Sequence, residues 1–185
     1  MDMEHPTLWA PWRLSYLQGL GSTDPSADQE DASCFLCEAS RAGLSDQDAA
    51  ERLVLARDSR GTLLLNRYPY SNGHLLAAPL DHLADLGDLT SRQRTGLMDL
   101  ADLACRLLRA VLNPQGINIG MNLGRCAGAG MPGHVHLHVV PRWHGDVNFM
   151  QVVGGVRVIP QALSDSFQAL RAKVGAVEGG SAGGS

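Results

Sequence analysis

Residues 133–143 read GHVHLHVVPRW and carry three of the seven histidines at alternate positions, His134, His136 and His138. Successive side chains of a β-strand point to opposite faces, so these three imidazoles should share one face, roughly 6–7 Å apart. That spacing lets one imidazole act as a ligand or nucleophile while the next contacts a substrate. A metal site that uses all three histidines and an exposed cluster without function are the alternatives. The residues expected to point into the core are Val135, Leu137 and Val139.

A glycine-rich stretch, GAGMPG at residues 128–133, directly precedes the histidines. It matches G-x-G-x-x-G, but a dinucleotide-binding loop must follow a strand and open a helix. This loop leads into the histidine strand, which excludes that interpretation. We expect instead a phosphate-binding loop flanked by Arg125 and Arg142, with a plain flexible connection as the alternative. Its expected backbone donors are Gly128, Ala129 and Gly130.

The remaining hydrophobic pattern predicts an α+β fold. Apolar residues recur at helical spacing over residues 90–112, where Thr90 can cap the start and Asn113-Pro114 the end. A closing helix is expected at residues 161–174. Because short β-type runs surround one long helix in chain order, they favour an antiparallel meander over a doubly wound sheet. The expected strands are residues 52–56, 62–66, 75–78, 117–122 and 134–141.

Length and composition are those of one globular domain with appendages. The 185 residues are 44 % hydrophobic and 18 % charged, and the net charge of −4 disfavours a broad nucleic-acid or anionic-membrane surface. No apolar run is long enough to span a membrane, and no signal peptide is visible, so a cytoplasmic protein is expected. The expected organisation is an N-terminal arm and loop (1–33), a central domain (34–145), an extension packed on that domain (146–175) and a flexible tail (176–185).

Four cysteines in a chain of this kind do not predict a disulfide framework. Cys34-Phe-Leu-Cys37 is a C-x-x-C pair, which can bind zinc from a single turn. A redox pair or two buried cysteines remain the alternatives. Cys105 lies on the apolar side of the predicted long helix and is expected in the core, and the fourth cysteine is Cys126.

Two motifs resemble those of the histidine triad (HIT) superfamily. The stretch HVHLHVV at residues 134–140 matches its H-φ-H-φ-H-φ-φ signature, where φ is apolar. Gly73-His74, an apolar strand and then Pro79-Leu-Asp-His82 match its G-H-x-φ-φ-x-P-x-x-H segment. The likeness covers residues 34–145. The flanking stretches LWAPWRLSY and PRW-x-G-D-x-N-F-M are similar to a bacterial branch, that of the diadenosine tetraphosphate phosphorylases or ATP adenylyltransferases.

This resemblance implies an active site. His136 would attack the α-phosphorus of a nucleotide to form a nucleotidyl-histidine, and His138 would contact the phosphate. A neutral imidazole suits this role, because its unperturbed pKa is about 6.5. Asn66 falls where the family binds the ribose, and Asn122 falls beside the phosphate or the nucleophile. His74 is expected among the substrate-binding residues.

The same resemblance implies a structural zinc, since several family members pair a C-x-x-C with two of these histidines. The implied ligands are Cys34, Cys37, His82 and His134. A closed four-ligand site would leave His136 free for chemistry. No organic cofactor is expected.

Three functions remain open at this level. The first is a transferase that cleaves diadenosine tetraphosphate with inorganic phosphate to ATP and ADP. The second is a hydrolase of dinucleoside polyphosphates or nucleoside phosphoramidates, and the third is a nucleotide-binding protein without turnover. Many hydrolases of the family carry Gln-Ser in the loop before the first histidine, and this chain carries neither residue there, which leaves the proton donor to the leaving group unassigned. The resemblance also implies a homodimer or larger homo-oligomer, and neither a nucleic acid nor a membrane is expected as a partner.

Overall fold

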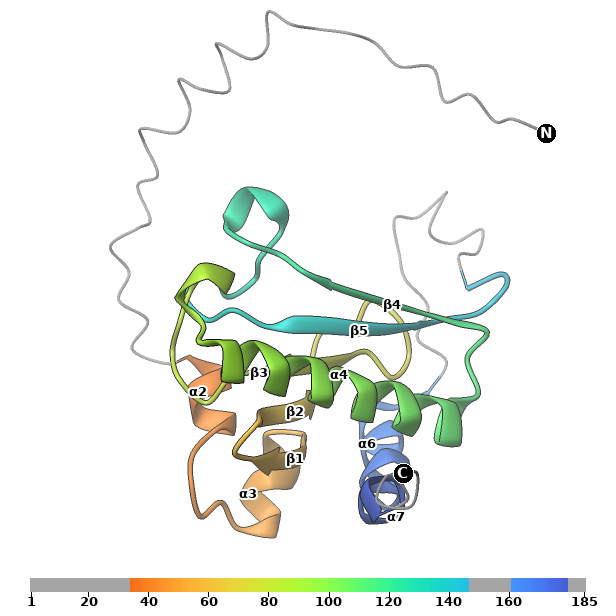
Figure 1. The fold of residues 1–185 in the computed structure, drawn as a ribbon. Coiled ribbons are helices and arrows are strands. Elements are labelled where there is room, and N and C mark those ends of the chain that lie inside the picture. Colours follow the sequence, from red (N-terminus) through yellow and green to blue (C-terminus); the bar gives the residue numbers. More distant parts are fainter. Residues whose placement is uncertain (1–33, 147–160, 180–185) are drawn as a thin grey trace, which may run out of the picture. The chain divides into compact units, whose positions relative to one another are not determined.

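A five-stranded antiparallel sheet forms the centre of the computed structural model, which describes residues 34–146 and 161–179 (Figure 1). The strands lie in the order β1-β2-β3-β5-β4. The first three form the expected meander, but β5 is inserted between β3 and β4, so a meander is wrong for the second half of the sheet. Their bounds are β1 Val54–Asp58, β2 Gly61–Leu65, β3 Leu75–Ala78, β4 Gly116–Met121 and β5 Leu137–Arg142.

One face of the sheet is covered by the long helix α4, Ser91–Leu112 (Figure 1). Thr90 caps it as predicted, because its hydroxyl accepts from the Gln93 N–H while the Gln93 side chain contacts the backbone of Thr90. The helix ends at Asn113, whose φ of 45° is left-handed. Its buried leucines and Cys105 pack in the main core with the three predicted apolar residues of the histidine segment, Val135, Leu137 and Val139.

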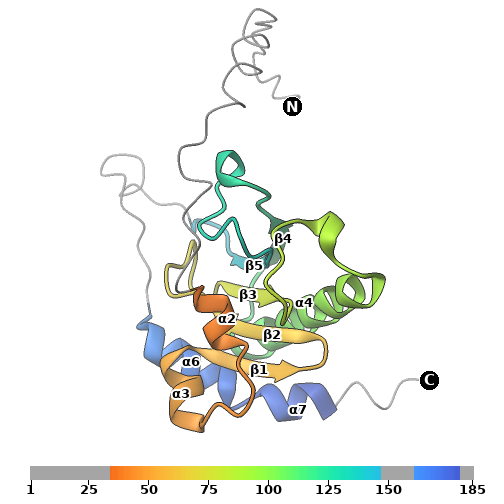
Figure 2. The ribbon, with the colours of Figure 1, turned by 90° about the vertical axis from the view of Figure 1, so that its left-hand side faces the viewer.

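The other face carries a smaller apolar cluster under helices α2 (Phe35–Ala39) and α3 (Asp46–Glu51). Figure 2 shows α2 and α4 on opposite sides of the strands. Two single turns of 3₁₀-helix, η1 (Leu86–Asp88) and η2 (Arg125–Ala127), lie in connections. The sheet is therefore the middle layer, and short elements surround its second face.

The last strand begins later than predicted, at Leu137, so His134 and His136 precede it. The reason lies in the backbone hydrogen bonds: the N–H of Val135 donates to Leu83 O over 2.6 Å and not to a neighbouring strand. The alternation still holds, because Val135 is buried in the main core.

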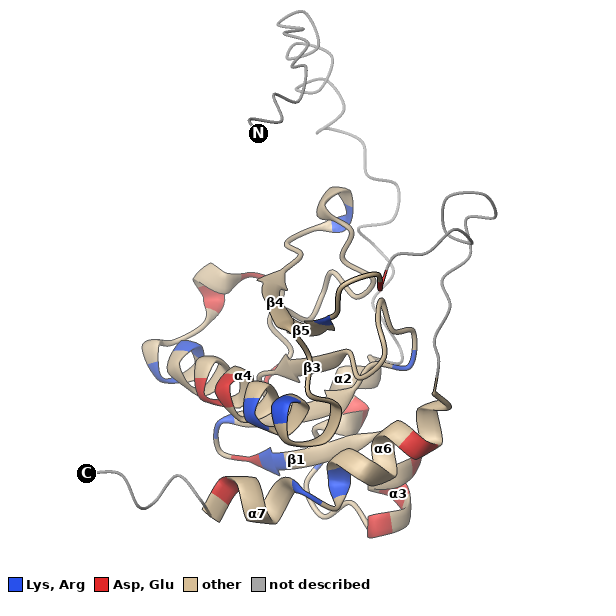
Figure 3. Cartoon of the chain, turned by 90° about the vertical axis from the view of Figure 1, so that its right-hand side faces the viewer, with Lys and Arg blue, Asp and Glu red and all other residues tan. Residues whose placement is uncertain are grey.

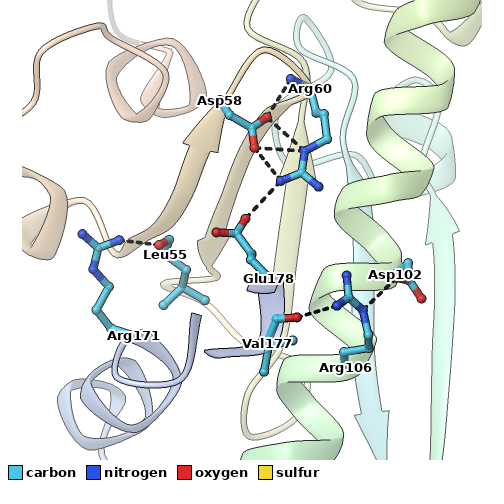
Figure 4. A network of polar contacts seen from close by, with 8 residues as sticks. All are labelled: Leu55, Asp58, Arg60, Asp102, Arg106, Arg171, Val177 and Glu178. Atoms are coloured by element: carbon cyan, nitrogen blue, oxygen red, sulfur yellow. Dashed lines mark hydrogen bonds and ion pairs between the residues drawn. The ribbon is translucent and has the colours of Figure 1, made fainter. Parts of the chain in front are cut away.

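The C-terminal part forms two helices, α6 (Leu163–Arg171) and α7 (Val174–Gly179), where one helix was expected. The expected start of the tail at residue 176 is also wrong, since the chain is helical through Gly179. Tertiary contacts hold this segment, as Figure 4 shows: Arg106 donates to Val177 O over 2.6 Å and Arg60 pairs with Glu178 over 3.0 Å.

The described part belongs to one compact unit, Ser33–Ser185. The predicted N-terminal arm (1–33), most of the predicted extension (147–160) and the final residues (180–185) lie outside the described residues. Along α4 in Figure 3, acidic residues lie in the middle of the helix and basic residues lie toward both ends. Arg106 and Asp102 of this helix form an ion pair. None of the described helices combines the length and the apolar character that a membrane crossing needs. All four cysteines are unpaired.

Candidate active site and metal site

Two cysteines and two histidines from three separate segments converge on one point. Cys34 is the N-cap of α2 and Cys37 lies within that helix, whereas His82 follows β3 and His134 precedes β5. Their ligand atoms all lie within 4.8 Å of one another, so they can hold a metal ion. This is the set of four that the family resemblance implied.

The hydrogen bonds of His134 prepare it to be a ligand. Its Nε2 lies 3.1 Å from the carbonyl oxygen of Pro79, and since a carbonyl only accepts, Nε2 carries the proton. Nδ1, with its lone pair, then faces the sulfurs of Cys34 and Cys37 at 3.4 Å each. Burial lowers the pKa of His134 to about 4, so the imidazole is neutral at neutral pH, as a metal ligand must be.

The pKa of the Cys37 thiol is shifted in the opposite direction to that of His134. Burial, followed by the hydrogen bond and charge of Cys34, raises its pKa to about 11. Its sulfur also lies 3.2 Å from Nδ1 of His82. A cation in this cluster would offset the cost of the buried thiolate, so the donor set fits a soft divalent metal such as zinc.

His136, the predicted nucleophile, is held in one tautomer. Its Nδ1–H donates to the backbone oxygen of His134 over 2.8 Å, which leaves the lone pair on Nε2. Burial lowers the pKa of His136, against the opposing effect of that hydrogen bond. The side chain is only 4 % exposed. The result is a neutral imidazole with a fixed orientation and one available nitrogen.

His138 is the last residue in a chain of hydrogen bonds that runs from Tyr70 through His74. The backbone N–H of Tyr70 donates to Nδ1 of His74 over 3.1 Å, so His74 carries its proton on Nε2. That Nε2–H donates to Nδ1 of His138 over 3.0 Å, which places the proton of His138 on its Nε2. The amide of Asn66 also approaches Nδ1 of His74, at 3.2 Å. Burial, with a smaller effect of His136, lowers the pKa of His138 to about 4.

Asn122 lies beside the donor nitrogen of His138. Its Nδ2 is 3.4 Å from Nε2 of His138 and donates to the carbonyl oxygen of Gly128 over 3.3 Å. In the tautomer just derived both nitrogens are donors, so they can converge on one acceptor such as a phosphate oxygen. On β5, His138 stands between Leu76 of β3 and Gly120 of β4, and a Cβ at Gly120 would meet open space. The site is therefore open on the β4 side.

Three of the expected substrate-binding residues make contacts within the protein. His74 is fully buried, and its side chain contacts His138. The N–H groups of Gly128 and Ala129 donate back into their own loop, to Arg125 O and Gly124 O, because η2 closes on itself. Two of the three expected backbone donors are thus already in use.

Arg142 is also engaged elsewhere. At the far end of β5 its guanidinium donates to Asp146 over 2.5 and 3.0 Å and to Asn118 over 3.1 Å. The ion pair with Asp146 raises the pKa of Arg142. A phosphate would have to compete with this carboxylate, so a phosphate contact from Arg142 requires the ion pair to open.

Tyr70 was missed at the sequence level. Its ring lies 4.7 Å from that of His74 and 5.6 Å from that of His138, nearly parallel to the latter at 26°. The side chain is 45 % exposed, so it forms part of the wall of the site. Its position in a turn directly before Gly73-His74 was a usable signal, since aromatic residues in exposed loops often serve binding.

Fold and site together define an α+β protein with a histidine-based candidate active site beside a Cys₂His₂ cluster. The chain belongs to the HIT domain family, whose model matches residues 47–145.

Among its relatives is a protein of Mycobacterium tuberculosis named AP-4-A phosphorylase, 41 % identical over 160 residues, which cover 86 % of this chain and 79 % of the relative. Another is the bis(5'-nucleosyl)-tetraphosphatase (asymmetrical) of Schizosaccharomyces pombe, 31 % identical over 93 residues, half of each chain. A similar solved structure is a Zn-bound histidine triad family protein from Mycobacterium smegmatis, with a TM-score of 0.62 and 27 % identity over 80 % of this chain and 97 % of that one.

The hydrogen bonds predict the protonation of each imidazole. At neutral pH, ¹⁵N NMR of the ring nitrogens should find His136 protonated on Nδ1, and His74 and His138 protonated on Nε2. His144, an exposed histidine outside the site, provides the control, since rapid exchange should average its two nitrogens. A His136 protonated on Nε2 would contradict the derived geometry.

Proposed function

We propose that this protein is a nucleotidyl transferase that cleaves diadenosine tetraphosphate with inorganic phosphate to give ATP and ADP. The observation that carries the proposal is the bond from His136 Nδ1–H to His134 O, which keeps a lone pair on Nε2. The relative named AP-4-A phosphorylase, at 41 % identity, supports this substrate and reaction.

The reaction takes two displacements at one phosphorus atom. Nε2 of His136 attacks the α-phosphorus, and as the N–P bond forms, the bond to the bridging oxygen breaks and ATP leaves. An oxygen of inorganic phosphate then attacks the same phosphorus, which forms ADP and returns the lone pair to His136. The covalent intermediate divides one difficult step into two easier ones.

We assign the substrate contacts as follows. The Nε2–H of His138 and the amide of Asn122 donate to a non-bridging oxygen of the α-phosphate, where negative charge grows in the transition state. Asn66 lies at the edge of the site near the ribose, and Gly130 contributes a backbone donor from the glycine loop. His74 and Tyr70 orient His138 and do not carry out a step themselves.

A hydrolase is the second candidate, and the yeast relative named a tetraphosphatase favours it. It shares the first displacement, but water replaces phosphate in the second. AMP would then be released in place of ADP.

Product analysis separates the two candidates. With diadenosine tetraphosphate we expect ATP and ADP, with turnover only when inorganic phosphate is present. His136→Ala should lower the rate by more than about 10³-fold, because the nucleophile is lost. Release of AMP at the same rate without phosphate would indicate the hydrolase, and full activity in His136→Ala would contradict the catalytic assignment.

We further propose that Cys34, Cys37, His82 and His134 bind a structural zinc ion. The convergence of their ligand atoms and the Zn-bound relative of known structure support this assignment. A zinc ion there would join α2 to the segment that carries His136, as a closed four-ligand site does in other small domains.

Unpaired cysteines fit a reducing compartment, which supports a cytoplasmic location.

Metal analysis of the purified protein should find one zinc per chain. Cys37→Ser should remove most of it and lower the thermal unfolding temperature, because the site loses one of four ligands. Cys126→Ser is the matched control, since Cys126 is exposed and outside the cluster, and it should keep its zinc. A wild-type protein without stoichiometric zinc would contradict the proposal.

We also propose a homodimer in which β4 pairs with β4 of a second copy. Among the described strands this one lies at the edge of the sheet, so one row of its backbone donors and acceptors has no described strand beside it. Ile119 on it is 45 % exposed although it lies on the face of the sheet that α4 covers elsewhere. A second copy would cover both features.

Sedimentation of the wild-type protein should give the mass of a dimer. Ile119→Arg should shift the distribution toward the monomer, whereas Met98→Arg, at an exposed apolar residue of α4, should leave the dimer intact. A wild-type monomer at micromolar concentration, or equal dissociation by both variants, would overturn this arrangement.

A further inference from the structure

We propose that helix α6 and the residues just before it position the active site through Asn72. Ser166 and Gln161 hold Asn72, and Asn72 fixes the turn from which Tyr70 and His74 orient His138. Ser166 and Asn72 are thus positioning residues. The inference rests on the proposed function only for the catalytic role of His138, since the geometry of the turn is independent of any substrate.

The contact joins residues that are far apart in the sequence. The hydroxyl of Ser166 donates to Oδ1 of Asn72 over 3.1 Å, and Nδ2 of Asn72 donates to Oε1 of Gln161 over 3.1 Å. Ser166 is 1 % exposed. A buried hydroxyl without a partner is costly, so this serine stabilises the structure only with the loop in place.

Helix α6 is itself fixed by the core and by hydrogen bonds, so it can hold Asn72 in place. Phe167, which directly follows Ser166, and Leu170, one helical turn after it, are buried in the main core. Arg171 donates to the carbonyl oxygen of Leu55 in β1, as Figure 4 shows. The following helix α7 is held in turn by Arg60 and Arg106. The position of Ser166 is therefore set by the sheet and by α4.

An open cavity of about 260 Å³ lies between α6 and the loop. Arg67, Pro69 and Gly73 line it from the loop, and Gln161 and Leu163 line it from the helix side. Asn72 also lines this cavity, and its two hydrogen bonds connect the loop to Gln161 and Ser166.

Asn72 is connected to His138 through the turn that contains Tyr70, Gly73 and His74. Gly73, with a φ of +75°, lies against α4, since a Cβ there would come within 2.3 Å of Leu112 Cδ1. The turn is thus held by α4 on one side and by Asn72 on the other. Within it, the His74 N–H donates to Ser71 O over 3.2 Å, and the Tyr70 N–H sets the tautomer of His74.

Loss of the Asn72 contact should therefore free the turn and weaken the hydrogen bonds that fix the tautomers of His74 and His138. Without the Tyr70 N–H, the contact left to Nδ1 of His74 is the Asn66 amide at 3.2 Å. Once the turn relaxes, that amide can rotate its oxygen toward His74, which then places its proton on Nδ1 and accepts from His138. His138 would then carry its proton on Nδ1 and present a lone pair, not a donor, to the phosphate. The donor that stabilises the transition state would be lost in that fraction of molecules.

The test compares Ser166→Ala with Ser164→Ala in zinc-loaded full-length protein. Ser164 is the matched control, because it lies on the same helix and is exposed. In Ser166→Ala, ¹⁵N NMR should show a second tautomer of His138, and kcat for diadenosine tetraphosphate should fall roughly tenfold while KM stays within about twofold. Ser164→Ala should match the wild type in both measurements.

Unchanged ¹⁵N shifts of His74 and His138 in Ser166→Ala would overturn the proposal. If that variant does not fold, Asn72→Ala, which removes both hydrogen bonds from a half-buried loop position, decides by the same two measurements. The NMR measurement needs no substrate, so it still decides the positioning role if the protein does not cleave diadenosine tetraphosphate. A fall in kcat with unchanged shifts would also count against it.

Discussion

The hydrogen bond from His136 Nδ1–H to the backbone oxygen of His134 is the contact on which the site depends. It orients His136, the proposed nucleophile, and also fixes the tautomer of its ring. His134 is itself held twice, by the carbonyl of Pro79 and by the cysteines that face its Nδ1. His134 thus links the Cys₂His₂ cluster to the proposed nucleophile, since its side chain belongs to the cluster and its backbone oxygen accepts from His136.

The fold makes this link rigid. The residues between the histidines are buried in the core beneath α4, so the imidazoles cannot turn without disturbing that core. Insertion of β5 between β3 and β4 brings His138 beside the loop that precedes β3, although 64 residues separate it from His74. Two independent supports, one at His134 and one at His74, therefore hold the two ends of a five-residue segment.

The sequence predicted those features that follow from spacing within a segment or from family resemblance. These are the alternation of histidines and apolar residues, the capped helix α4 and the four residues of the Cys₂His₂ cluster. The insertion of β5, the helical end at Val174–Gly179 and the partners of Arg142 could not, because they depend on contacts between distant segments. His74 illustrates the difference: its motif was recognised, but its burial behind His138 is a tertiary property.

The most direct measurement is to locate the covalent intermediate. Protein mixed with diadenosine tetraphosphate in the absence of inorganic phosphate, then quenched at alkaline pH to preserve a phosphoramidate, can be digested and mapped by mass spectrometry. The adenylyl group is expected on His136 alone, on Nε2, and it should disappear when inorganic phosphate is added. An adduct on another residue, or turnover without any adduct, would contradict the role derived for His136.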